Sequence, residues 1–105
     1  MKILAEHLRV HGMRISAGPW TIYGESARPS EGKVIVALGR IAGKAATRSR
    51  IRRIAREVFS SRFGSAGDIN LLLLARGDVT SHPRRKVRLH LSKLLVRIPG
   101  ALARQ

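Results

Sequence analysis

The sequence contains no cysteine, few acidic residues and no long apolar run. The lack of cysteine excludes a disulfide framework, a thiol nucleophile and a cysteine-ligated zinc site, and it suits a reducing cytoplasm. The longest apolar run, Leu71 to Ala75, is far too short to span a bilayer. Charge interrupts residues 1–6 too early for a secretory signal. We therefore expect a cytoplasmic protein that does not enter a membrane.

Basic residues, in contrast, are abundant. The 21 Lys and Arg residues against 6 Asp and Glu residues give a net charge of +15, and only five of the 21 are lysines. Such an excess of one charge repels itself in the folded state, so the protein is expected to meet a polyanion. Arginine favours nucleic acid in particular, because its planar guanidinium pairs two-fold with phosphate and stacks on bases. A rival interpretation has basic helices bound to an anionic lipid surface, but the apolar strand predicted below argues for a folded core.

The N-terminal half of the chain reads as one short helix followed by strands. A loose helical spacing predicts a helix over residues 2–11, ended by Gly12. Residues 14–26 read as a strand interrupted at Gly18-Pro19, and residues 33–38 as a second strand. Because a turn-rich segment separates them, we expect these two strands to form a hairpin. The apolar positions of the first helix are Ile3, Leu4, Leu8 and Val10.

Residues 44–63 form the most clearly predicted helix of the sequence. Thr47 is its candidate N-cap, and Gly64 follows its last turn as a stop signal. Residues 68–75 then read as a strand without alternation, which predicts a central strand covered on both faces. The inward positions of the helix are Ile51, Ile54, Ala55, Val58 and Phe59.

Pro83 is predicted to open a last helix that runs to about Arg97, where Pro99-Gly100 closes it. The resulting order, α-β-β(-β)-α-β-α, indicates an α+β domain of two layers. The length of 105 residues and the apolar content of 44% fit one folded domain over residues 1–105. The inward positions of the last helix are Val87, Leu91, Leu94, Leu95 and Ile98.

The predicted helix over residues 44–63 carries most of the clustered positive charge. At about 100° per residue, Arg48, Arg52 and Arg56 follow one flank of the apolar stripe. Arg50 and Arg53 lie on the other side, where Arg53 is expected to pair with Glu57. Like charges at this spacing destabilise an isolated helix, and contact with phosphate would offset that cost. The pattern therefore favours a nucleic-acid contact over a merely solvated face.

A second basic run, Arg84-Arg85-Lys86 with Arg88, begins the last helix, where the helix dipole disfavours cations. It is either a second contact with nucleic acid or a solubilising helix start.

The segment from Gly43 to Phe59, GKAATRSRIRRIAREVF, resembles the signature helix of the bacterial ribonuclease P protein family. That signature has an Arg-Asn-Arg core, a basic pair and then Arg-Glu-x-Phe. The likeness continues outside the helix at Gly12, at the strand aromatics Trp20 and Tyr23, and at Gly67-Asp68-Ile69. It covers nearly the whole chain.

The sequence departs from the family pattern at several positions. Ser49 stands where the family usually has Asn, and Arg40-Ile41 replaces a usual pair of lysines. Ala5 and Arg9 occupy positions of the first helix where aromatic residues are common.

The resemblance implies a two-layer α/β sandwich of α-β-β-β-α-β-α order, ribosomal-protein-like, with a left-handed crossover helix. It also implies a protein subunit that binds the catalytic RNA of ribonuclease P and assists removal of 5′ leaders from precursor tRNA. A cleft between the sheet and the first helix would receive the leader by means of Trp20 and Tyr23; the alternative is that both rings are core residues. The implied RNA contacts are Arg40, Lys44, Arg48, Ser49, Arg50, Arg52, Arg53 and Arg56.

The residues suggest no active site made by the protein itself. His7 and His11 have the spacing of two metal ligands on a helix but lack a third. We expect the cleavage chemistry to belong to the RNA and its Mg²⁺ ions, with no metal site and no small-molecule ligand on the protein. The alternative function is that of a ribosomal or other structural RNA-binding protein without a role in cleavage.

Overall fold

A mixed sheet divides the molecule into two unequal layers. The computed structural model describes residues 2–63 and 67–104, apart from the side chains of residues 2 and 3, and over these residues the sheet has four strands in the order β1-β2-β4-β3. β1 pairs with β2 and β2 with β4 in antiparallel fashion, whereas β3 pairs with β4 in parallel. The strands are β1 (Met13–Ala17), β2 (Trp20–Ser26), β3 (Val34–Ala37) and β4 (Ile69–Ala75).

The predicted hairpin between residues 14–26 and 33–38 is wrong. The hairpin lies within the first segment, where a turn at Gly18-Pro19 joins β1 to β2; Gly18 has a φ of 55°, which suits glycine. β3 instead lies beside β4, with Val34 opposite Leu71. A central strand that is apolar on both faces needs a neighbour on each side, and no local turn signal specifies which distant strand will supply it.

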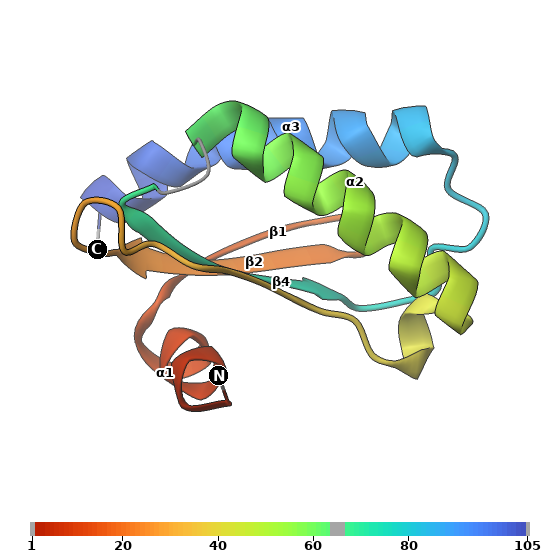
Figure 1. The fold of residues 1–105 in the computed structure, drawn as a ribbon, viewed down its shortest axis with the longest axis horizontal. Helices are drawn as coiled ribbons and strands as arrows, with labels where there is room; N and C mark the ends of the chain where they lie inside the picture. The colour runs from red at the N-terminus through yellow and green to blue at the C-terminus, as the bar shows by residue number, and fades with distance from the viewer. Residues whose placement is uncertain (1, 64–66, 105) are drawn as a thin grey trace.

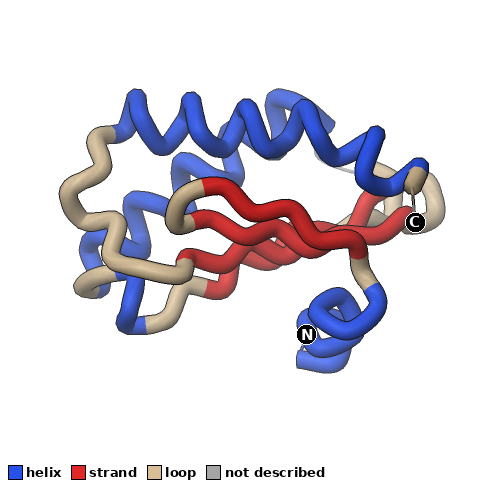
Figure 2. Tube along the Cα trace, turned by 180° about the vertical axis from the view of Figure 1, so that it is seen from behind, coloured by secondary structure: helices blue, strands red, loops and turns tan. Residues whose placement is uncertain are grey.

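Two helices cover one face of the sheet and a short helix lies against the other (Figures 1 and 2). α2 (Ala45–Phe63) and α3 (Arg84–Ala103) form the thick layer, and a 3₁₀ turn, η1 (Arg40–Ala42), leads into α2. α1 (Lys2–His11) packs on the opposite side against β2 and β4. In Figure 1 the chain leaves β3 at the front of the sheet, returns through α2 above the sheet and enters β4 behind β3. This connection between parallel strands is left-handed, as the resemblance implied.

The main core lies between the sheet and the pair α2 and α3. Every predicted inward residue of both helices is buried there, which confirms the apolar stripes read from the sequence. β4 is confirmed as the central strand, since Leu71 and Leu73 belong to this core while Leu72 is buried on the α1 side with Leu8. Val10, which the helical spacing placed among the apolar positions of α1, is instead 74% exposed. The side chain of Ile3 lies outside the described residues.

Two predicted helix boundaries differ from the structure, and a third is not tested. Thr47 is not an N-cap: α2 begins at Ala45, so Thr47 lies in its first turn. Pro99 does not end α3, which continues to Ala103 because Ile98 and Ala101 extend the buried stripe past the proline. That burial offsets the backbone hydrogen bond that Pro99 cannot donate. The stop predicted at Gly64 lies outside the described residues.

Candidate nucleic-acid interface

Three arginines follow one side of α2 and form what we call the arginine row: Arg48, Arg52 and Arg56. They recur every four residues, a rise of about 6 Å per step. Arg48 and Arg52 are half-buried and Arg56 is exposed, so the row flanks the buried stripe as predicted. Arg56 shares a pocket with Val34 of β3, which places this end of the row beside the open edge of the sheet. Such a row can follow a chain of phosphates without disturbing the core.

The arginine row begins in a groove at the start of α2. Arg40, Lys44 and Arg48 line this groove, whose volume is about 690 Å³, together with Asp78 and Thr80. The first turn of α2 contains no acidic residue, and the positive end of the helix dipole points here. The Nε atom of Arg48 is buried without a hydrogen-bond partner among the described residues. The groove therefore concentrates positive charge suited to a phosphate group.

The loop between β4 and α3 fixes the shape of this groove. Thr80 accepts a hydrogen bond from the Thr47 hydroxyl at 3.4 Å, and its backbone N–H donates to Asp78 Oδ1 at 2.7 Å. Hydrogen bonds from the side chain and the backbone of Thr80 lower the pKa of Asp78 below its ordinary value. Gly43 has a φ of 136°, and a Cβ there would lie 2.6 Å from Thr80 Oγ1. Gly43 is thus required by both its conformation and its close approach to the loop.

Arg50, an expected RNA contact, makes hydrogen bonds within the fold. Its Nη1 atom donates to the carbonyl of His82 at 3.0 Å and its Nη2 atom to the carbonyl of Thr80 at 3.4 Å. These bonds tie α2 to the loop before α3. Burial, and then the charges of Lys86, His90 and Arg50, lower the pKa of His82.

The predicted pair between Arg53 and Glu57 is wrong. Glu57 pairs with Arg88 of α3, because that flank of α2 faces α3 and a tertiary neighbour supplies the cation. Arg53 and Ser49 are exposed on the outer surface of α2.

In the second basic run, at the start of α3, Arg84, Arg85 and Lys86 are exposed, while Arg88 is half-buried and paired with Glu57.

The two aromatic residues predicted for the leader cleft point to opposite sides of the sheet. Trp20 is 0% exposed and belongs to the core beneath α2 and α3, so its ring has no free face for a base. Tyr23, three residues later in β2, lies half-buried on the α1 side. The assignment of Trp20 to the cleft is therefore wrong: it is a core residue, and Tyr23 alone stays a candidate.

Tyr23 belongs to a line of residues across the α1 side of the sheet. Arg14 of β1 lies opposite Tyr23, Leu72 of β4 lies on its other side, and Ile35 of β3 lies opposite Leu72. We call these four residues the sheet row. Beside them His7 Nε2 of α1 lies 3.0 Å from Glu25 Oε2 of β2. An exposed guanidinium next to a half-buried phenol ring offers both a phosphate contact and a stacking surface.

No group of three His, Asp or Glu residues in the described part of the chain is placed to hold a metal ion. The rings of His7 and His11 lie 4.9 Å apart, and His7 contacts Glu25. Within the same described residues, no helix is both long and apolar enough to cross a membrane.

Comparison with known proteins agrees with this architecture. A sequence model of the family Ribonuclease P matches residues 6–99. The chain belongs to the ribonuclease P protein family. A search among curated proteins finds no match. Family membership connects the chain with a ribonucleoprotein endoribonuclease, with tRNA processing and with an RNA partner.

Solved structures of ribonuclease P proteins share the fold. The protein from Staphylococcus aureus superposes with a TM-score of 0.81 at 14% identity, over 97% of this chain and 94% of that one. The protein from Thermotoga maritima gives a TM-score of 0.74 at 17% identity, over 89% of each chain. Both are bacterial proteins, and at such low identity they establish the fold rather than the function of individual residues.

Arg14 is a candidate that reasoning from the sequence missed. Its signal was available in the tight turn at Gly18-Pro19: a two-residue turn places Ala17 opposite Trp20, and counting back three pairs places Arg14 opposite Tyr23. The partners of Glu57 and Arg50, in contrast, come from α3 and from its preceding loop, about thirty residues away, and no local spacing indicates them.

Proposed function

We propose that this chain is the protein subunit of ribonuclease P, which binds the catalytic RNA and the 5′ leader of precursor tRNA during 5′ maturation of tRNA. The arginine row carries the proposal, because it is an ordered line of cations on a rigid helix of a chain that belongs to this family. A structural RNA-binding protein could use the same row, so the proposal also depends on the second, chemically different surface at Tyr23.

The arginine row and the groove before it are the proposed contact with the RNA subunit. Lys44 and Arg40 extend the row beyond the start of α2, where the exposed backbone N–H groups add a further positive contribution. Ser49 and Arg53 lie on the adjoining exposed surface and stay within the proposed interface. Arg50 is left out, because backbone carbonyls already engage its guanidinium.

The sheet row is the proposed binding surface for the leader. A leader is single-stranded, and an aromatic ring holds unpaired bases by stacking without demanding a sequence. Tyr23 supplies the ring and Arg14 lies beside it for the adjacent phosphate. Further along the row, half-buried Ile35 adds apolar surface, whereas Leu72 is 0% exposed and supports the row from within the fold.

The proposed site of catalysis is the RNA subunit, with Mg²⁺ ions held by RNA and substrate phosphates. In the described structure Glu57 pairs with Arg88 and Asp78 accepts a hydrogen bond from Thr80, so both carboxylates already have partners in the fold. The protein would contribute by screening phosphate charge and by fixing the position of the substrate. We place this assembly in the cytoplasm.

Reconstitution tests the proposal. The purified protein is mixed with a bacterial ribonuclease P RNA and precursor tRNA at a Mg²⁺ concentration too low for the RNA alone. Protein-dependent release of a 5′ leader of correct length is the expected result. Binding of the RNA without any effect on cleavage would instead indicate a structural RNA-binding protein.

A further inference from the structure

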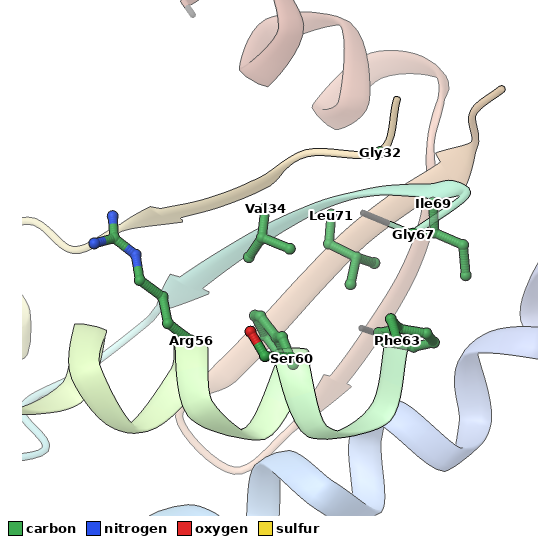
Figure 3. A pocket seen from close by; sticks show the side chains of 9 residues that line it. Gly32, Val34, Arg56, Ser60, Phe63, Gly67, Ile69 and Leu71 are labelled. Atoms are coloured by element: carbon green, nitrogen blue, oxygen red, sulfur yellow. The ribbon is translucent and has the colours of Figure 1, made fainter. Parts of the chain in front are cut away.

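A pocket of about 230 Å³ opens between α2 and the sheet, at the start of β3 (Figure 3). Its floor consists of Phe59 and Leu71, which are 2% and 1% exposed. The pocket lies on the α2 side of the sheet, whereas the sheet row lies on the α1 side, so the two surfaces are separate. Because β3 is an edge strand, no further strand of the described sheet covers its outer side.

The walls of this pocket are apolar and partly open to solvent. Val34 is 37% exposed, and Phe63 and Ile69 are half-buried, although all three belong to regular elements. Gly32 closes one end by close backbone contact: its N–H donates to the Gly67 carbonyl at 2.8 Å, and a Cβ at Gly32 would lie 2.4 Å from the carbonyl oxygen of Ile69. The pocket is therefore built into the sheet rather than left between loosely packed side chains.

The last member of the arginine row lies at the rim of the pocket. Figure 3 shows Arg56 extending from α2 toward β3, with Ser60 one turn further along the helix. The described residues that line the pocket include no Asp or Glu. An apolar slot next to a guanidinium fits a flat, weakly polar ring attached to a phosphate. A cavity of about 150 Å³ can hold benzene, so this one has room for a single base.

We propose that this pocket binds one unpaired nucleobase of the RNA whose phosphates follow the arginine row. The ring lies between Val34 and Phe63, and Arg56 holds the phosphate of the same or the adjoining nucleotide. Unpaired bases that turn out of an RNA strand are commonly bound by aromatic and apolar side chains. The inference rests on the proposed function for the source of the RNA, but the pocket itself can be tested without that RNA.

Nucleotides are the first probe. The protein is titrated with adenosine and uridine 5′-monophosphates while the Val34 and Ile69 methyl groups and the Phe63 ring are followed by NMR. Nucleotides should shift these signals, whereas ribose 5-phosphate, which lacks a base, should shift only the signals of Arg56 and its surroundings. Identical shifts from all three compounds would show that a phosphate alone binds at Arg56, and would overturn the inference. Unmoved methyl and ring signals would overturn it as well.

Filling the pocket is the second test. Val34→Tyr, at an exposed position of β3, places a ring in the pocket. The matched control is Val96→Tyr on α3, where Val96 is 60% exposed. Loss of one stacked base should weaken binding of a bacterial ribonuclease P RNA by about five- to 150-fold, and the control should not. The salt dependence of binding should stay unchanged in Val34→Tyr but should flatten in Arg56→Gln, since only the latter removes a phosphate contact.

Phe63→Leu keeps an apolar side chain but removes the stacking ring, and it decides the question if Val34→Tyr fails to fold. Folded Val34→Tyr and Phe63→Leu variants that bind the RNA as tightly as the parent protein would overturn the inference. If the parent protein does not bind ribonuclease P RNA at all, the proposed function fails instead, and the nucleotide titration still decides whether the pocket takes a base.

Discussion

At the scale of single residues, position along β2 separates a core residue from one that is proposed to bind the leader. Successive side chains of a strand point to opposite faces, so Trp20 and Tyr23, three residues apart, cannot share a surface. Trp20 fills the core under α2 and α3, and Tyr23 lies half-buried beside α1. Two aromatic residues of similar chemistry therefore have different consequences when they are replaced.

We expect Tyr23→Ala to weaken precursor tRNA binding more than mature tRNA binding, because stacking of one leader base is worth roughly 1–3 kcal/mol. Trp20→Ala should instead destabilise the fold by about 3–5 kcal/mol and affect both substrates equally. Binding of the two tRNA forms to the reconstituted complex, with thermal unfolding as a control, measures both effects. Equal weakening of the two substrates by a folded Tyr23→Ala variant would contradict the leader assignment.

The titration of His82 is coupled to folding. Burial and neighbouring positive charges lower its folded pKa, so below the ordinary histidine pKa of about 6.5 the unfolded chain binds the proton more strongly. The contribution of His82 to the free energy of unfolding should therefore be fully present above that pH and should be lost as the pH falls toward the folded pKa. His82→Phe should flatten the dependence of the melting temperature on pH in this range. An equally acid-sensitive variant would show that another group is responsible.

At the scale of elements, α2 combines three functions on one helix. One stripe packs into the core, one flank carries the arginine row, and the other flank meets α3 through Glu57 and Arg88. The first two could be predicted from the sequence, because a helical period of 3.6 residues fixes which side chains share a face. The third could not, since the partner of Glu57 depends on how α3 packs.

The strands show the same division between local and distant information. The break at Gly18-Pro19 and the central position of β4 could be predicted from turn residues and from the apolar run. The pairing of β3 could not, because β3 lies beside a strand that follows a helix of 19 residues. The candidate site follows this pattern: the arginine row was predicted, whereas Arg14 and the role of Arg50 depend on register and tertiary contact.

The arginine row makes a prediction at this scale. Replacing Arg48, Arg52 and Arg56 together with Gln removes three charges but keeps good helix formers, so the fold should survive or gain from reduced repulsion. Binding of ribonuclease P RNA should weaken, and its salt slope should flatten by up to about 0.9 log units for each phosphate that the variant no longer binds. Replacement with Lys should rescue binding only in part, because lysine lacks the two-pronged geometry.

Arg104, in the turn that follows α3, is the matched control, and Arg104→Gln should change RNA binding little. A folded triple variant with unchanged affinity and salt slope would refute the role given to the row.

At the scale of the whole molecule, the sheet keeps the two proposed binding surfaces apart. The radius of gyration is 12.9 Å, so a net charge of +15 is confined to a small volume. A field of this sign attracts polyanions such as RNA from a distance, while the sheet separates the arginine row on the α2 side from the phenol ring on the α1 side. Under the proposed function, this separation lets the chain hold a folded RNA and a single strand at the same time.

Under the proposed function, the RNA subunit carries out the chemical step and the protein contributes only binding and positioning. We expect rigorously nuclease-free protein to cleave no RNA, and Glu57→Gln to leave the rate of the chemical step nearly unchanged in the reconstituted complex. Glu57 and its partner Arg88 are both about half exposed, and a pair in that setting contributes at most about 1 kcal/mol. Single-turnover cleavage at saturating complex isolates the chemical step from binding. A rate loss of several orders of magnitude in a folded Glu57→Gln variant would make Glu57 a catalyst and would move part of the chemistry from the RNA to the protein.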